Sequence, residues 1–141
     1  MTKAAIMRDV MTPLPHSIEI TRSVKEAKET MELHDVRHLP VEKDGEIVGI
    51  LSQRNVLFAT GLEASGKARL YVDDVYTPEP YMVDSGTKLA NVLEIMAKER
   101  YGCALVCDQG ELVGIFTTTD ACRMFADFLL TAEGQEICAA L

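Results

Sequence analysis

Hydrophobic residues recur at helical spacing in two stretches of the chain. In the first stretch, apolar residues three or four positions apart predict an amphipathic helix that begins near Ser23. Glu26 follows three residues later, which is the spacing of a capping box. The first apolar stripe comprises Val24, Ala27 and Met31, and the second comprises Leu89, Val92, Leu93 and Met96. We expect both stripes to lie in a hydrophobic core.

Each predicted helix is followed by a hairpin of two short strands, at residues 38–51 and 103–116. The first hairpin has Asp-Gly at residues 44–45, a pair that favours a tight two-residue turn. Each second strand leads directly into another helix, expected to begin near Ser52 or Thr117. The order in each half is therefore β-α-β-β-α, in an α+β fold.

These elements belong to a sequence duplication with an offset of 65 residues. Residues 8–56 aligned with residues 73–121 give 13 identities in 49 positions. Asp-Val-x-Thr-Pro occurs in both copies, at residues 9–13 and 74–78. A long repeat present only twice indicates a duplicated half-domain rather than an open solenoid, which needs three or more repeats. Two such halves can pack about a pseudo-twofold axis and form paired clefts, where we expect the function to lie.

The duplication divides the chain into predicted regions. They are a first repeat (residues 1–60), a linker (61–72), a second repeat (73–124) and a C-terminal helical extension (125–141). In the extension, Phe125, Phe128, Leu129 and Ile137 are expected to form a buried face. Gly134 is expected to break the helix. The sequence leaves open whether this extension covers its own domain or a partner subunit.

The composition indicates a soluble globular protein of about one domain. Of the 141 residues, 48% are hydrophobic and 26% are charged. The net charge of −8 argues against a general nucleic-acid surface, although a small anion can still bind locally. No segment approaches the roughly 18 apolar residues of a membrane-spanning helix, and the N-terminus does not resemble a signal peptide. We therefore expect a cytoplasmic protein that does not associate with membranes.

Neither the cysteines nor the histidines form a catalytic or metal-binding motif. The four cysteines, at positions 103, 107, 122 and 138, include no CxxC pair and are expected to be buried reduced thiols. The histidines are His16, His34 and His38, all in the other repeat. No HExxH, GxSxG or P-loop pattern accompanies them. We expect neither an enzyme, nor a metal, nor a required cofactor.

One constellation that recurs in both repeats suggests a binding function. In each repeat a strand glycine precedes a hydroxyl residue, Ser52 or Thr117, at the junction with the helix. Asn55 or Asp120 follows one turn later. Backbone N–H groups and the helix dipole at such a junction can hold an anion, and the side chain one turn later can accept from a sugar hydroxyl. The same pattern also fits an ordinary helix N-cap without a ligand.

Together these motifs resemble a tandem pair of CBS domains (a Bateman module), regulatory domains first named for cystathionine β-synthase. The resemblance covers residues 8–121 and rests on the Asp-Val-x-Thr-Pro segments, residues 37–41, the Asp-Gly hairpin, and residues 49–55 and 114–120 in combination. It implies two units paired through their sheets, often dimerised. It also implies clefts between the repeats for adenosine-type ligands: AMP, ADP, ATP or S-adenosylmethionine.

In that family the hydroxyl at the Ser52 or Thr117 position contacts phosphate, and the acid at the Asp120 position holds ribose. The candidate ligand-binding residues are Thr12, Pro13, Val36, Arg37, His38, Pro40, Ser52, Asn55, Thr77, Pro78, Ala104, Thr117 and Asp120. The resemblance predicts a stand-alone regulatory module that forms a homodimer and acts on an unidentified effector protein. The alternative is a ligand-independent dimerisation module in which both hydroxyls are only helix caps.

The two predicted binding seats, one at Ser52 and Asn55 and the other at Thr117 and Asp120, are not equivalent. Asn55 in the first repeat lacks the charge with which Asp120 can strengthen a bond to ribose hydroxyls. The first repeat instead carries Arg37 and His38, where the second has glycine and cysteine. Arg37 could hold a phosphate bidentately or could be an exposed cation, and His38 could contact the ligand or be a structural histidine. We expect the seat with Asp120 to bind more tightly.

Overall fold

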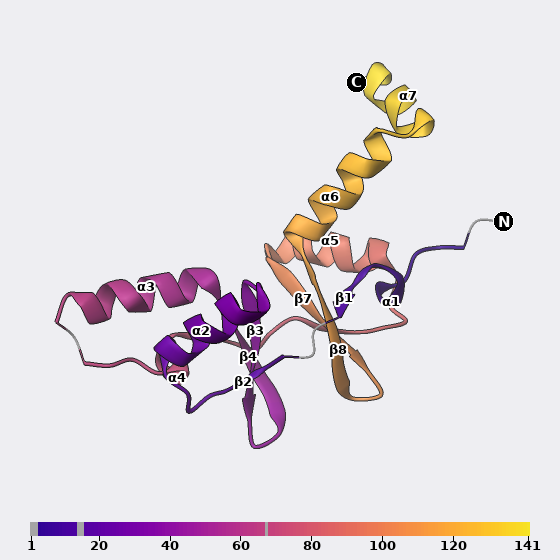
Figure 1. Ribbon diagram of the computed structural model, residues 1–141. Helices are drawn as coiled ribbons and strands as arrows, with labels where there is room; N and C mark the ends of the chain where they lie inside the picture. Colours follow the sequence, from indigo (N-terminus) through magenta and orange to yellow (C-terminus); the bar gives the residue numbers. More distant parts are fainter. Residues whose placement is uncertain (1–2, 14–15, 67) are drawn as a thin grey trace. The chain divides into compact units, whose positions relative to one another are not determined.

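The chain forms two compact units, seen in the computed structural model (Figure 1). The structure describes residues 3–13, 16–66 and 68–141. The central unit comprises residues 15–80, and the terminal unit comprises residues 1–14 together with 81–141. Each unit has its own four-stranded sheet and its own helices, which confirms the predicted α+β fold with two repeats.

The central unit follows the predicted β-α-β-β-α order and adds a short helix and strand. Its elements are β2 (Ile18–Glu19), α2 (Val24–His34), β3 (His38–Lys43), β4 (Glu46–Ser52), α3 (Gln53–Ala64), α4 (Val72–Val75) and β5 (Thr77–Pro78). The sheet order is β2-β3-β4-β5, with β2 parallel to β3 and the other pairs antiparallel. Asp44 and Gly45 both have positive φ, at 52° and 80°, as the tight hairpin turn requires.

The terminal unit repeats this plan and continues into two further helices. Its elements are α1 (Met7–Val10), β1 (Thr12–Pro13), β6 (Met82–Asp84), α5 (Leu89–Glu99), β7 (Cys103–Asp108), β8 (Glu111–Thr117), α6 (Thr118–Leu129) and α7 (Ala132–Ala140). The sheet order is β1-β8-β7-β6. Gln109 and Gly110 form the hairpin turn, with φ of 51° and 80°. α6 extends away from the end of β8 and carries α7 (Figure 1).

The two sequence repeats exchange their Thr-Pro segments. β1, from the first repeat, pairs with β8 of the second, whereas β5, from the second repeat, pairs with β4 of the first. The short helices before these segments are exchanged in the same way. Met7 of α1 is buried in the terminal unit, and Val72 of α4 is buried in the central unit. The compact units therefore differ from the sequence repeats. The repeat boundaries at residues 60, 72 and 124 remain predictions.

The predicted first helix and its core stripe are confirmed. Ser23 caps α2 by accepting from the Glu26 N–H at 3.1 Å, and Glu26 accepts in turn from the Ser23 N–H at 3.2 Å. The side chains of Val24, Ala27, Met31, Val92 and Met96 are all buried, as predicted. Leu93 was expected in the core but lies on the surface, because its position on α5 turns away from the sheet.

The segment predicted as a linker, residues 61–72, contains the end of one helix. α3 continues to Ala64, so the first residues of the predicted linker are helical. Ser65 and Gly66 end this helix, and Gly66 has a positive φ of 92°. Lys67 lies outside the described residues.

The predicted helix break at Gly134 is wrong. α6 ends before Thr131, whose hydroxyl caps α7 by accepting from the Gly134 N–H at 3.1 Å. Gly134 is buried inside α7, and a Cβ at this position would overlap the carbonyl of Phe128. The glycine thus allows α7 to pack closely against the end of α6, instead of ending a helix.

The C-terminal apolar face is not buried within this chain, and its burial against a partner subunit stays a prediction. Phe125 is 60% exposed, Phe128 39% and Ile137 48%, while Leu129 is half-buried. α6 has no fully buried residue among those described, since it extends beyond the sheet instead of lying across it.

Candidate functional site

The predicted seat of the central unit lies where β4 passes into α3. Ser52 ends β4 opposite His38 of β3 and is the N-cap of α3. Its hydroxyl oxygen accepts from the Asn55 N–H at 3.1 Å. The Asn55 Oδ1 accepts from both the N–H and the hydroxyl of Ser52, each at 2.9 Å. The two side chains therefore form a closed capping box at this junction.

The seat of the terminal unit has the same arrangement with a charged partner. The Thr117 hydroxyl oxygen accepts from the Asp120 N–H at 3.2 Å. Asp120 Oδ2 accepts from the Thr117 N–H at 2.9 Å and from its hydroxyl at 3.0 Å. The other oxygen, Oδ1, lies 3.6 Å from a guanidinium nitrogen of Arg123. Because that arginine is largely exposed, the ion pair is weak and a ligand could replace it.

Both junctions offer an anion fewer free N–H groups than the sequence predicts. The first helical N–H of α3, on Gln53, donates to the Arg37 carbonyl at 2.8 Å. In the terminal unit the Thr118 N–H donates to the Gly102 carbonyl at 3.0 Å. The third N–H in each helix is taken by the capping hydroxyl. Of the first three N–H groups, the second therefore stays available to an anion in each helix.

The remaining candidates divide between exposed and buried positions. Arg37 is exposed beside the central junction, and His38 is partly buried. Val36 packs against the core of the central unit. Pro40 and Ala104 are completely buried within β3 and β7, so their side chains serve the cores.

The exchange of Thr-Pro segments decides which candidates share a unit. The central unit brings together Val36, Arg37, His38, Pro40, Ser52, Asn55, Thr77 and Pro78. The terminal unit brings together Thr12, Pro13, Ala104, Thr117 and Asp120. The sequence did not reveal this exchange, because the spacing of the Thr-Pro segments is the same in both copies and fits pairing within a repeat equally well.

The repeated strand glycines have a packing function. A Cβ at Gly49 would overlap the Thr77 carbonyl and the Tyr76 ring. A Cβ at Gly114 would lie 2.6 Å from the Met11 sulfur and close to the backbone that follows it. The glycine three residues before each hydroxyl thus admits the neighbouring Thr-Pro segment, so its recurrence is explained without a ligand.

The thiols divide into two kinds. Burial raises the pKa of Cys103 to about 11, and burial together with the charge of Asp84 raises the pKa of Cys107. These two thiols are therefore protonated near neutral pH, which makes them weak nucleophiles and weak metal ligands. Cys122 and Cys138 are exposed, contrary to the expectation of four buried thiols. Within the described part of the chain, no three His, Cys, Asp or Glu residues are grouped as a metal site would need.

The duplicated junctions and the two-unit architecture define a known class of regulatory fold. The chain belongs to the CBS-domain family, because the model of the CBS domain matches residues 7–61 and 72–127. Among solved structures, a Vibrio cholerae protein assigned to acetoin utilization (AcuB) is 29% identical, with a TM-score of 0.73 and coverage of 95% of this chain and 97% of that one. CBSX2, solved in complex with AMP, is 26% identical, with a TM-score of 0.68 and coverage of 87% and 97%.

Curated relatives place the same module inside longer proteins. The inosine-5'-monophosphate dehydrogenase of Korarchaeum cryptofilum is 33% identical over 116 residues, which make up 82% of this chain but 22% of the relative. The chain thus spans about a quarter or less of the first curated relatives it matches. Among the described helices, none has the length and apolar character needed to cross a membrane.

Proposed function

We propose that this CBS pair is a regulatory module that binds an adenosine-type ligand, AMP, ADP, ATP or S-adenosylmethionine. The observation that carries the proposal is the duplicated strand-to-helix junction, with a hydroxyl and a carbonyl or carboxylate oxygen held 2.9–3.0 Å apart in each unit. The complex of CBSX2 with AMP supports the choice of ligand class.

The two junctions differ in what they can offer such a ligand. In the terminal unit, ribose hydroxyls would donate to Asp120 in place of Arg123 and the Thr117 hydroxyl, which would then be released toward phosphate. Bonds to a carboxylate are stronger than bonds to an amide. In the central unit Asn55 offers a neutral acceptor, while the exposed guanidinium of Arg37 supplies charge for a phosphate. The terminal seat is therefore the tighter one for the ribose.

Regulation follows from differential binding. A ligand shifts an equilibrium between two arrangements of the protein only by its difference in affinity for them. We propose that the arrangement favoured by the ligand is recognised by an effector protein, and that the module acts as a cytoplasmic homodimer without catalysis or a required cofactor. The raised thiol pKa values favour a non-catalytic role, because they leave Cys103 and Cys107 as thiols.

A second candidate function is supported by the junction geometry itself. Ser52 with Asn55 and Thr117 with Asp120 complete their capping boxes without any ligand. Such junctions suit a ligand-independent dimerisation module, in which the hydroxyls serve only to begin the helices.

Calorimetric titration with AMP and ATP tests the ligand-binding function. The decisive variant is Asp120→Asn, which gives the terminal seat the amide that already caps α3 in the central unit. We expect this variant to weaken AMP binding about fivefold to tenfold, since a charge-assisted bond is lost while the cap is kept. The matched control, Asn55→Asp, should leave the terminal seat unchanged and strengthen the central one.

Two results would decide against this assignment. Equal AMP affinity in the wild type and Asp120→Asn would exclude Asp120 as a ribose ligand. A bound ligand at about 100 times its Kd should stabilise the protein by about 2.7 kcal/mol. Absence of any thermal shift with AMP, ADP, ATP and S-adenosylmethionine would favour the dimerisation module instead.

A further inference from the structure

Apolar side chains form a stripe on one face of α6, and most of the stripe is exposed. Ala121, Met124, Phe125 and Phe128 have the three- and four-residue spacing that places side chains on one side of a helix. Met124 is 37% exposed, Phe125 60% and Phe128 39%. The stripe begins at Ala121, which packs against the core of the terminal unit, and continues where α6 extends beyond the sheet (Figure 1). The rings of Phe125 and Phe128 stack with centroids 6.4 Å apart.

The equivalent helix of the central unit, α3, does not carry this stripe. At an offset of 65 residues, the four corresponding positions are Val56, Ala59, Thr60 and Glu63. The first two are buried, and α3 packs against α2. The last two are polar, and the Thr60 hydroxyl donates to the Val56 carbonyl at 2.8 Å. The fold therefore does not require phenylalanine at these two positions, and the pair on α6 needs an explanation of its own.

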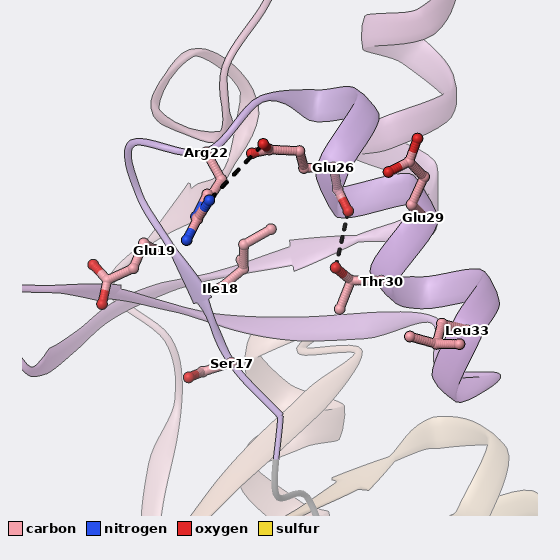
Figure 2. A pocket seen from close by; sticks show the side chains of 8 residues that line it. All are labelled: Ser17, Ile18, Glu19, Arg22, Glu26, Glu29, Thr30 and Leu33. Atoms are coloured by element: carbon pink, nitrogen blue, oxygen red, sulfur yellow. Dashed lines mark hydrogen bonds and ion pairs between the residues drawn. The ribbon is translucent and has the colours of Figure 1, made fainter.

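Exposed apolar side chains of the central unit have polar surroundings instead. Leu33 borders a groove between β2 and α2 whose lining includes Arg22 and Glu26, an ion pair at 3.9 Å (Figure 2). Phe58 is 65% exposed and lies one turn from Arg54 on α3. The four positions of the α6 stripe, in contrast, include no charged or polar residue. The stripe is therefore suited to an apolar partner.

We propose that the stripe binds the same stripe of a second copy of this chain. In this arrangement two α6 helices pack antiparallel about a twofold axis that passes between Met124 and Phe125. The inference rests on the homodimer of the proposed function and goes beyond it by naming the contact surface and its orientation.

The stripe is complementary to itself in this orientation. Reversing α6 about an axis between residues 124 and 125 places Ala121 opposite Phe128 of the second copy. The smallest side chain of one stripe thus lies against one of the largest of the other, which allows close packing. Met124 lies against Phe125 of the second copy, and contacts between a thioether sulfur and an aromatic ring are favourable.

Charge favours both an uncharged contact and the antiparallel orientation. Each copy has a net charge of −8, so two copies repel each other where their acidic groups approach. Antiparallel helices carry Asp120, in the first turn of α6, to opposite ends of the pair, and their dipoles then oppose each other. Parallel helices would bring both Asp120 carboxylates and both sheets to the same end. The antiparallel pair therefore avoids the larger repulsion.

The apolar area fits a small, reversible interface. The exposed parts of Met124, Phe125 and Phe128 amount to roughly 300 Å² per copy, since a phenylalanine offers about 150–250 Å². An apolar patch of this size often marks an interaction site. A standard interface buries about 800 Å² per partner, so flanking side chains and Ile137 of α7, which is 48% exposed, must supply the rest. We therefore expect a dimer that dissociates on dilution.

Analytical ultracentrifugation without nucleotide, at roughly 1 and 100 μM protein, tests this inference. We expect the wild type to be dimeric at the higher concentration. The double variant Phe125→Glu/Phe128→Glu should raise the dimer Kd at least about 100-fold, because each substitution occurs twice in a symmetric interface. Its far-UV circular dichroism should stay unchanged, since both side chains are exposed. The matched control is Phe58→Glu, at a similarly exposed phenylalanine of α3, which should dimerise like the wild type.

Amide hydrogen exchange of the wild type at the two concentrations locates the contact without any substitution. Protection should rise with concentration at residues 121–128 and stay constant in α3. A Kd unchanged in the double variant, a dimer weakened only by Phe58→Glu, or protection that rises in α3 instead would overturn the inference and leave the homodimer standing. A monomer at both concentrations would overturn the inference and the homodimer together. The AMP titration reports the proposed nucleotide function separately, since the dimer is measured without ligand.

Discussion

The central and terminal units cap their junction helices with nearly identical geometry but different charge. The oxygen of Asn55 and the oxygen of Asp120 accept from the preceding hydroxyls at 2.9 and 3.0 Å. In the reciprocal hydrogen bonds, the backbone N–H groups of Asn55 and Asp120 donate to those hydroxyl oxygens at 3.1 and 3.2 Å. An amide thus performs the capping role as well as a carboxylate does. The charge of Asp120 is not needed to start its helix, which leaves it available for a ligand.

The points where the chain passes between units also differ. His16, just after the first crossing, stacks on His34 with ring centroids 3.5 Å apart and an angle of 16°. Tyr81, at the equivalent position after the second crossing, packs against Tyr101 at 5.1 Å and 32°. Aromatic contact is therefore kept at both crossings while its chemistry changes. We infer that the features common to both units are required by the fold, whereas the features that differ between the units can serve a function.

The largest expected effect tests whether the two units unfold independently of each other, as their separate hydrophobic cores suggest. Leu51 and Phe116 occupy equivalent positions, and both are completely buried, each in its own unit. We expect Leu51→Ala to cost about 2–5 kcal/mol and Phe116→Ala about 3–5 kcal/mol of unfolding free energy, from lost burial and the cavity left behind. Urea unfolding followed by hydrogen exchange measures both the cost and its location.

Loss of exchange protection should be confined to the unit that carries the substitution. Conservative replacements at the same sites, Leu51→Met and Phe116→Leu, serve as controls and should cost less. Equal loss of protection in both units after either alanine substitution would show that they unfold as one cooperative body, contrary to the division into two cores.

A smaller effect compares how tightly each Thr-Pro segment is held. A Cβ at Gly49 would overlap the rigid Thr77 carbonyl and the Tyr76 ring. At Gly114 the nearest atom belongs to the flexible Met11 side chain, and the Thr12 carbonyl oxygen would lie less close, at 2.9 Å. We expect Gly49→Ala to destabilise by about 1–3 kcal/mol and Gly114→Ala by less. Urea unfolding of both variants checks this order.

Gly102→Ala provides the control for adding a methyl group, because a Cβ there meets no atom within 4 Å. If Gly49→Ala and Gly114→Ala lower the free energy of unfolding equally, the Met11 side chain must be held as firmly as the Thr77 carbonyl. The difference between the two exchanged segments would then disappear.

Local features could be predicted from the sequence, but contacts between distant segments could not. The Ser23 cap, the Asp-Gly turn and the junctions at Ser52 and Thr117 depend on residues three or four positions apart, where side-chain chemistry decides the structure. The exchange of β1 and β5 depends on which sheet edge each segment reaches. Both choices give the same backbone pairing, so the residue pattern does not distinguish them.

The C-terminal helices show the same limit in another form. An apolar stripe at helical spacing predicted a buried face around Phe125, but periodicity reports only that a helix has two faces. It does not say whether anything covers the apolar one. Gly134 was interpreted through its low helix propensity, whereas its function depends on the close approach of α7 to α6. The local chemistry of a site can be predicted from residues close together in the sequence. The segments that pack around the site can be identified only from the structure.

The smallest effect concerns pH and a residue found only in the terminal unit. Burial raises the pKa of Cys103 from 9.0 to about 11, whereas the equivalent position of the central unit is His38. Between pH 9 and 11 the unfolded chain releases the thiol proton while the folded protein keeps it. Stability must therefore fall as pH rises through this range, by up to about 1.4 kcal/mol per pH unit for this group. Below about pH 8 the group has almost no effect on the slope.

Urea unfolding under reducing conditions at pH 8, 9, 10 and 11, on the wild type and Cys103→Ala, isolates this contribution. Lysine and tyrosine titrations affect both proteins equally and cancel in the difference. We expect the stability of the wild type relative to Cys103→Ala to be constant up to about pH 8 and then to decline, by about 1 kcal/mol per pH unit between pH 9 and 11. Cys122→Ala, at an exposed cysteine, should give a profile parallel to the wild type. Parallel profiles for Cys103→Ala as well would show that water reaches the Cys103 thiol and that burial does not raise its pKa.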